Sequence, residues 1–194
     1  MIAVLGYGSL IWDLDGLAPH VEGGWAMNAG PALPMEFSRI SAKRKRGLVV
    51  CLDPADGVDC PTHAIRSRRS EIGQAASDLA QREHAPLGRI GYVCLSSDRA
   101  AGRLPSICAA VAVWCRQAGW QGAVWTDLEP NFASEAGQPF SVPRGLAYLR
   151  ALSGESRSEA VRYIACAPHQ TDTPLRQALA GLAWWADARR ELGV

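Results

Sequence analysis

The feature that most constrains this chain is its first segment, IAVLGYGSLIWD, where glycines break an apolar run almost at once. Residues 2–5 form a short uninterrupted apolar run, which predicts a buried β-strand. Gly6 and Gly8 then predict a turn that needs either unusual backbone dihedral angles or the close approach of another group to the backbone. The sequence therefore predicts a strand that ends in a loop made mostly of backbone.

The composition bounds the class of protein. A length of 194 residues with 48% hydrophobic residues suits one globular domain. Lys plus Arg number 20 and Asp plus Glu 19, so a net charge of +1 gives no global attraction to nucleic acid or to a membrane surface. No run reaches the roughly 18 apolar residues of a membrane span, and the start lacks the features of a signal peptide. We expect a cytoplasmic, soluble protein that is a monomer or a homodimer.

The cysteines and histidines predict neither a disulfide framework nor a metal site. The six cysteines contain no C-x-x-C pair, so we expect reduced, mostly buried thiols, with a catalytic cysteine as the alternative. The four histidines lack the spacings of known zinc motifs. We expect no metal and no cofactor.

Strands are expected early in the chain and helices late. The apolar runs that predict strands are residues 2–5, 48–52, 62–66, 89–95 and 122–126. The second and third of these runs are separated by turn residues and predict a hairpin. Residues 107–114 are apolar on both faces and fit either a strand or a buried helix.

The expected helices lie at residues 71–84, 142–152, 157–166 and 174–186, the last beginning with Thr173 as N-cap and Pro174. Early strands and late helices predict an α+β fold. We expect a single domain over residues 1–194, with a core at 1–100. Residues 101–194 would then be a C-terminal part packed on that core.

Two common interpretations of the glycine loop fail on spacing. A dinucleotide-binding G-x-G-x-x-G motif would need a third glycine where the chain has Ile11. A nucleophile elbow centred on Ser9 would need glycines where the chain has Tyr7 and Ile11. Ser9 is therefore not expected to be a nucleophile.

The basic run KRKR at residues 43–46 allows two interpretations. It is short enough to be an ordinary solvated loop, which we favour. The other interpretation is contact with phosphate, and it makes nucleic-acid binding a third functional hypothesis. We expect no nucleic-acid partner.

Glu83 is the one charged residue that breaks the pattern of its helix. The apolar stripe of the expected helix is Ile72, Ala75, Ala76 and Leu79, whereas Gln74, Asp78, Gln81 and Arg82 are expected on the solvent side. At roughly 100° per residue, Glu83 returns to within about 20° of Ile72 and so points toward the core. A carboxyl group held there can accept a proton and later return it. The alternative is a plain ion pair with Arg39 or Arg89.

The loop Tyr7-Gly8-Ser9-Leu10, followed by Ile11-Trp12, and the helix end Leu79-x-x-Arg82-Glu83 together resemble the γ-glutamylcyclotransferase-like superfamily, in particular its ChaC branch. The segments at 37–39 and 48–54 are also similar to ChaC segments. The resemblance covers about residues 2–95, half of the chain. Its Y-G-S-L loop is fairly specific, and its R-E pair is much less so.

The resemblance implies a small mixed β-barrel with surrounding helices, here with a helical C-terminal extension. It implies a cofactor-independent enzyme that cyclises a γ-glutamyl group to 5-oxoproline and releases an amino acid, peptide or amine. Glutathione or another γ-glutamyl peptide is the first expected substrate class, and γ-glutamyl amines are the second. Carried onto this chain, Glu83 is the catalytic acid and base. Tyr7, Gly8, Ser9 and Leu10 bind the substrate.

The chain also departs from the family pattern. The family commonly has a small-residue strand before the catalytic helix, whereas this chain has Pro61-Thr-His63-Ala-Ile-Arg66. The half after residue 100 has no counterpart in the resemblance. The alternative function is therefore a non-catalytic protein that uses the same pocket to bind a small molecule or a partner.

Overall fold

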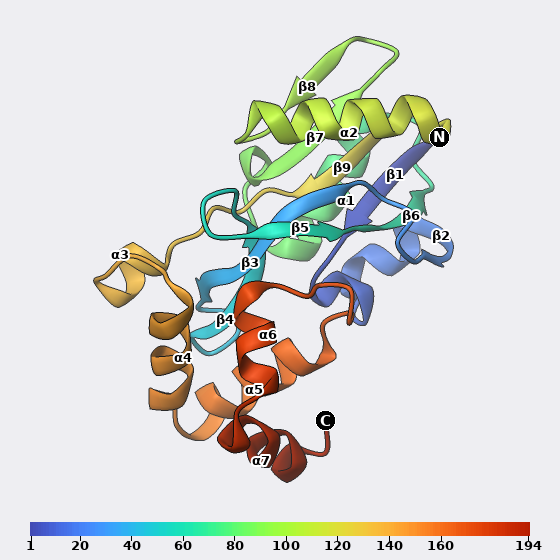
Figure 1. Ribbon diagram of the computed structural model, residues 1–194. Coiled ribbons are helices and arrows are strands. Elements are labelled where there is room, and N and C mark those ends of the chain that lie inside the picture. The colour runs from blue at the N-terminus through green and yellow to red at the C-terminus, as the bar shows by residue number, and fades with distance from the viewer. The chain divides into compact units, whose positions relative to one another are not determined.

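The computed structural model describes residues 1–194, and the chain divides into two compact units, each made of two separate stretches. The first unit contains Met1–Leu33 and Pro61–Leu128, and the second contains Pro34–Cys60 and Glu129–Val194. Both contain strands and helices, so the fold is α+β (Figure 1). These boundaries differ from the expected division after residue 100, because residues beyond it complete the sheet that the N-terminal strand begins.

One mixed sheet organises the first unit. Its strand order is β2-β6-β1-β9-β7-β8. The strands are β1 Ile2–Gly6, β2 Val21–Ala26, β6 His63–Ser67, β7 Ile90–Cys94, β8 Arg99–Ala101 and β9 Gly122–Thr126. Every neighbouring pair is antiparallel except β1 and β9, which run parallel from Ile2↔Gly122 to Leu5↔Trp125. Figure 1 shows β1 in dark blue beside β9 in yellow.

The parallel pairing explains why the N-terminal strand is apolar throughout. All five residues of β1 are buried, as expected for a strand covered on both faces. Parallel strands end at the same edge of a sheet, so the loop after β1 lies beside the end of β9. The Tyr7 hydroxyl donates a hydrogen bond to the carbonyl oxygen of Thr126 and ties the two ends together.

The helices of the first unit are α1 Ile72–Glu83 and α2 Pro105–Ala118, with short 3-10 helices η1 Ser9–Ile11, η2 Asp15–His20 and η3 Leu87–Arg89. Residues 107–114, which fitted either a strand or a helix, are helical. Pro105 begins α2, and Gly119 ends it in the left-handed region with φ of 76°. Its buried residues Ile107, Val111 and Cys115 recur every four positions, as a helix requires.

The hairpin predicted from residues 48–52 and 62–66 is wrong. Both runs are strands, but β4 (Gly47–Leu52) pairs with β3 (Ala32–Ser41), whereas β6 pairs with β1 and β2. The two runs are separated by a further strand, β5 (Val58–Pro61), and they belong to different sheets. β4 forms its hairpin with the preceding strand β3, which the sequence analysis did not predict, and β6 pairs with strands of the other sheet.

The second unit combines a three-stranded sheet, ordered β4-β3-β5, with five helices. The helices are α3 Phe132–Ala136, α4 Val142–Ala151, α5 Gly154–Cys166, α6 Pro174–Ala180 and α7 Ala183–Leu192. The single helix expected over 174–186 is two helices, because Leu182 is extended with ψ of 123° and begins α7. As predicted, Thr173 caps α6 by accepting a hydrogen bond from the N–H of Arg176.

No helix of the chain is both long and apolar enough to cross a membrane. The longest, α2, has 14 residues, whereas a span needs about 20.

A buried carboxyl group, Glu36 on β3, fastens helix α6 to the sheet of the second unit. Its two oxygens accept hydrogen bonds from the N–H of Phe37 at 2.7 Å and from the N–H of Leu175 at 3.1 Å. Burial raises the pKa of Glu36 above its ordinary 4.5, against the opposing effect of hydrogen bonds from Thr173, Phe37 and Leu175. The folded state therefore binds the Glu36 proton more tightly than the unfolded chain does.

This shift predicts a pH dependence for the variant Glu36→Gln. Glutamine has one acceptor oxygen for two N–H donors, so the variant should unfold more easily than wild type at pH 4.5, by about 1–3 kcal/mol. The wild-type contribution is complete below pH 4.5 and is lost as the pH rises through the raised folded pKa. The difference in unfolding free energy between the two proteins should therefore shrink toward neutral pH.

Urea unfolding followed by circular dichroism measures this difference at each pH. A difference that stays constant or grows with pH would contradict the assignment of the shift to Glu36.

Candidate functional site

Gly6, the last residue of β1, leaves room for a large neighbour because it has no side chain. A Cβ atom on Gly6 would lie 2.6 Å from Cη2 of Trp25 and 2.8 Å from Cδ1 of Ile11. The sequence suggested two reasons for a glycine here, unusual dihedral angles or the close approach of another group to the backbone. Gly6 is explained by the second reason. Gly8 has φ of −127°, outside the left-handed region, so it is not held there by a positive φ.

The loop is folded by its own backbone into the 3-10 helix η1. The carbonyl of Gly8 accepts from the N–H of Ile11, and that of Ser9 accepts from the N–H groups of Trp12 and Asp13. The N–H groups of Ser9 and Leu10 begin η1 and have no partner within that helix. These two donors are what the loop can offer to a ligand.

The four residues expected to bind the substrate have different surroundings. Leu10 belongs to the hydrophobic core cluster, and the Tyr7 hydroxyl is bonded to Thr126, so both side chains anchor the loop. Gly8 is buried, whereas Ser9 is half-buried and its hydroxyl faces Arg82. The Ser9 hydroxyl is therefore the side-chain group of the loop that reaches the end of α1.

Arg82 joins the loop to Glu83. Its side chain is 2% exposed, and its Nη1 lies 2.7 Å from Oε1 of Glu83. Its guanidinium also lies 3.4 Å and 3.5 Å from Oγ of Ser9 and donates to the carbonyl of Asp13. One buried cation thus contacts both the Glu83 carboxylate and a loop residue, Ser9, that lies 73 positions before Arg82 in sequence.

Glu83 lies on the side of α1 that the sequence predicted. It is the last residue of the helix, before His84 in the left-handed region with φ of 51°, and its side chain is 16% exposed. It stands at the margin of the core, where a carboxylate can keep contact with solvent or a ligand.

The prediction that Asp78 and Arg82 face solvent is wrong. Gln74 and Gln81 are exposed, but Asp78 and Arg82 are buried. Arg82 follows Leu79 by three positions and therefore lies within about 60° of it on a helix. That spacing was a usable signal, but residue type alone suggested solvent because charged side chains are rarely buried unpaired.

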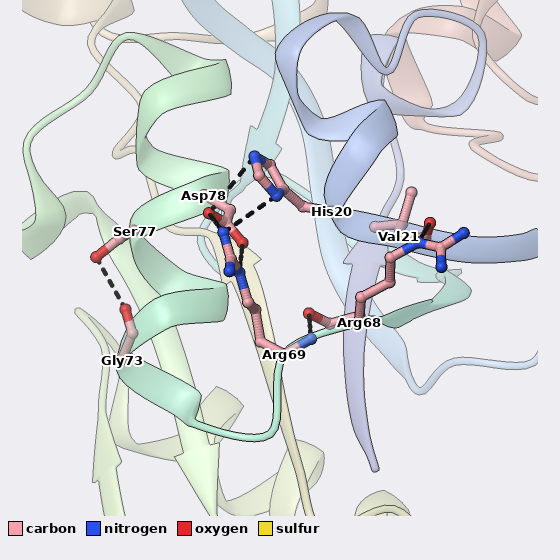
Figure 2. A network of polar contacts seen from close by, with 8 residues as sticks. His20, Val21, Arg68, Arg69, Gly73, Ser77 and Asp78 are labelled. Atoms are coloured by element: carbon pink, nitrogen blue, oxygen red, sulfur yellow. Dashed lines mark hydrogen bonds and ion pairs between the residues drawn. The ribbon is translucent and has the colours of Figure 1, made fainter.

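Asp78 forms a second polar network one turn earlier on α1, shown in Figure 2. Its oxygens lie 2.7 Å and 3.0 Å from Nε and Nη2 of Arg69, a bidentate pair. His20 adds a contact of 3.1 Å to Arg69 and one of 3.8 Å to Asp78. The network ties α1 to the segment before it and to η2, and so fixes the helix that carries Arg82 and Glu83.

The basic run at 43–46 is largely compensated within the second unit. Arg44, Lys45 and Arg46 form ion pairs, with N–O distances of 3.0, 3.6 and 3.1 Å, to Glu159, Glu155 and Glu135. These carboxylates reduce the positive field that a phosphate would meet, which favours the interpretation of the run as an ordinary loop.

A shallow open depression beside α1 is not part of the candidate site. Its volume is about 610 Å³, and it is lined by Ser77, Ala80, Gln81, His84, Ala85 and Leu87. Neither Glu83 nor the loop at 7–10 lines it. No group of three or more His, Cys, Asp or Glu side chains is arranged to hold a metal ion.

Comparisons with known proteins give no relative for this chain: no protein-family description, no curated protein and no solved structure matches it.

The contacts of the buried Arg82 side chain predict the outcome of Arg82→Lys. Lysine keeps the charge but has one nitrogen, which cannot contact Ser9, Asp13 and Glu83 together as the guanidinium does. The variant should lose about 1–3 kcal/mol of unfolding free energy. Amide hydrogen exchange over residues 9–13 should become faster.

The matched control is Arg66→Lys, since Arg66 pairs with Glu22 at 2.9 Å but its side chain is 51% exposed. It should change stability by no more than about 0.5 kcal/mol. Equal exchange and stability in the two variants would show that Arg82 does not hold the loop.

Proposed function

We propose that the chain is a γ-glutamylcyclotransferase-like enzyme in which Glu83 is the general base and then the general acid. The observation that carries the proposal is the Ser9–Arg82–Glu83 contact. It brings together, within one compact unit, the Y-G-S-L loop and the R-E pair on which the resemblance rests. We also propose the family's small mixed β-barrel as the detailed fold class.

The reaction needs one group that moves a proton twice. As a carboxylate, Glu83 accepts a proton from the α-ammonium of the γ-glutamyl group, whose nitrogen then attacks its own γ-carbonyl carbon. The new C–N bond closes the five-membered ring, and the bond from that carbon to the leaving nitrogen breaks. Glu83 returns its proton to the leaving nitrogen, and the ring nitrogen gives up a second proton, which the departing amine takes up. The products are 5-oxoproline and an ammonium group on the released half, with no net change in the enzyme.

The loop suits the charge that develops in this step. The γ-carbonyl oxygen becomes negative when the amine attacks, and backbone N–H groups aimed at it stabilise that charge. The N–H groups of Ser9 and Leu10 begin η1 and serve this role in the proposal. Arg82 acts through its neighbours, because it positions both the loop and the Glu83 carboxylate.

Substrate class follows from the same groups. Recognition is directed at the glutamyl half, and the leaving group is defined only by its amide nitrogen. Glutathione and other γ-glutamyl peptides are proposed as the first class, and γ-glutamyl amines as the second.

The test is mass-spectrometric detection of 5-oxoproline from glutathione, γ-glutamyl dipeptides and γ-glutamyl amines. Glu83→Gln keeps an oxygen for Arg82 but removes the proton acceptor, so product formation should fall by about 10²–10⁴-fold. Glu71→Gln is the control, because Glu71 is exposed at the other end of α1 and its side chain caps nothing.

Equal turnover by wild type and Glu83→Gln would refute the role of Glu83. Ligand binding without product from the whole panel would support the alternative function, a non-catalytic protein that uses the same pocket.

A further inference from the structure

Trp12 places an exposed aromatic ring at the end of the glycine loop. The residue is 39% exposed, and of the large apolar side chains that are exposed it is the only aromatic one. A single exposed apolar residue is common on a protein surface, so exposure alone assigns Trp12 no role. Its place at the end of η1 is what distinguishes it.

The geometry of η1 sets the direction in which Trp12 projects. A 3-10 helix has about three residues per turn, so side chains at positions i and i+3 leave it on the same side. Ser9 and Trp12 are such a pair, and the N–H of Trp12 donates to the carbonyl of Ser9 at 3.2 Å. The Ser9 hydroxyl faces the guanidinium of Arg82 at the end of α1. Trp12 therefore projects from the side of η1 that faces Arg82.

The backbone that carries Trp12 is held on both sides of the residue. The carbonyl of Ser9 also accepts from the N–H of Asp13 at 2.9 Å, and the carbonyl of Asp13 accepts from Arg82. Arg82 in turn pairs with Glu83 at 2.7 Å. The segment is thus fixed relative to the Glu83 carboxylate, and contact of the ring with a ligand does not require the ordering of a flexible loop.

The proposed reaction brings the leaving group to this segment. Glu83 must reach the leaving nitrogen to return its proton, so the bond that breaks lies beside the Arg82–Glu83 pair. Gly8 and Leu10 are buried, whereas Glu83 is partly exposed and Trp12 is exposed. The glutamyl half belongs on the buried side of the loop. The leaving half, which varies in size, extends toward the exposed side, where Trp12 lies.

We infer that the ring of Trp12 contacts the leaving half of the γ-glutamyl substrate and favours leaving groups with an apolar side chain, an inference that rests on the proposed function. An indole offers a large apolar face, and a side chain laid against it removes apolar surface of both groups from water. A leaving half that is glycine has no side chain to place there. Trp12 is therefore a specificity-determining residue.

The experiment measures kcat/KM for γ-glutamylleucine and γ-glutamylglycine with wild type, Trp12→Ala and Trp12→Phe. Wild type should prefer γ-glutamylleucine by about tenfold, and Trp12→Ala should reduce this ratio to about twofold. Trp12→Phe keeps an aromatic face and should keep most of the preference. A wild type without the preference, or a ratio that Trp12→Ala leaves unchanged, would overturn the contact.

Leu87→Ala is the matched control, because Leu87 is 54% exposed and lines the depression beside α1 rather than the loop. It should keep the wild-type ratio within about twofold. Loss of the preference in Leu87→Ala but not in Trp12→Ala would place the leaving half in that depression and overturn the role of Trp12.

Binding of the same two dipeptides, measured by isothermal titration calorimetry, separates this inference from the proposed function. Conversion by wild type with a ratio that does not depend on Trp12 would leave the enzyme assignment standing and refute the contact. Binding without formation of 5-oxoproline, with a preference for leucine that Trp12→Ala removes, would support the contact and refute the cyclotransferase. A wild type that neither binds nor converts either dipeptide would refute both.

Discussion

The side chain of Arg82 is the constraint on which the candidate site depends. Moving a guanidinium out of water costs several kcal/mol unless its donors are satisfied. Here the partners are a hydroxyl, a backbone carbonyl and a carboxylate, from Ser9, Asp13 and Glu83. Movement of Glu83 would separate the ion pair, and movement of Ser9 or Asp13 would take a hydrogen-bond acceptor away from the buried guanidinium. The conformation of the loop and the position of the carboxylate are thus coupled through one cation.

The sheet of the first unit and helix α1 place Arg82 and its partners where these contacts can form. Parallel pairing of β1 with β9 leaves the loop at the strand ends, where Tyr7 is bonded to Thr126. On α1, Asp78 and Arg82 are one turn apart and both buried, so the pair with Arg69 fixes the rotation of the helix that presents Glu83. The chemistry proposed for Glu83 requires such fixed geometry, since a small displacement of a reacting group is costly in rate.

Local pattern predicted those elements whose burial follows from residue type. The apolar runs at 2–5 and 122–126 are strands, α1 spans nearly its predicted residues, and Glu83 lies on the predicted side. The expected hairpin at 48–66 was wrong, because β4 pairs with the unpredicted strand β3. The partners of β1, which are β6 and β9, lie far away in sequence and leave no local signal. The break at Leu182 likewise depends on tertiary packing rather than on the apolar spacing.

The polar interior was the hardest part of the site to predict. Arg82 was expected in solvent because its partners at Ser9 and Asp13 become visible only when the loop is folded. Trp25 gave no sequence signal, since its contact with Gly6 exists only in three dimensions. Whether a polar group can be buried depends on the partners that it finds in the folded chain. A single sequence does not show which groups will be partners.

The most direct measurement is a crystal structure of Glu83→Gln soaked with glutathione. If Arg82 assembles a γ-glutamyl site, the glutamyl group will lie with its γ-carbonyl against the N–H groups of Ser9 and Leu10. Its α-nitrogen will then lie within hydrogen-bond distance of the side chain at position 83. Glutathione bound instead in the depression lined by Gln81 and His84, with the loop unoccupied, would contradict the assignment of this site.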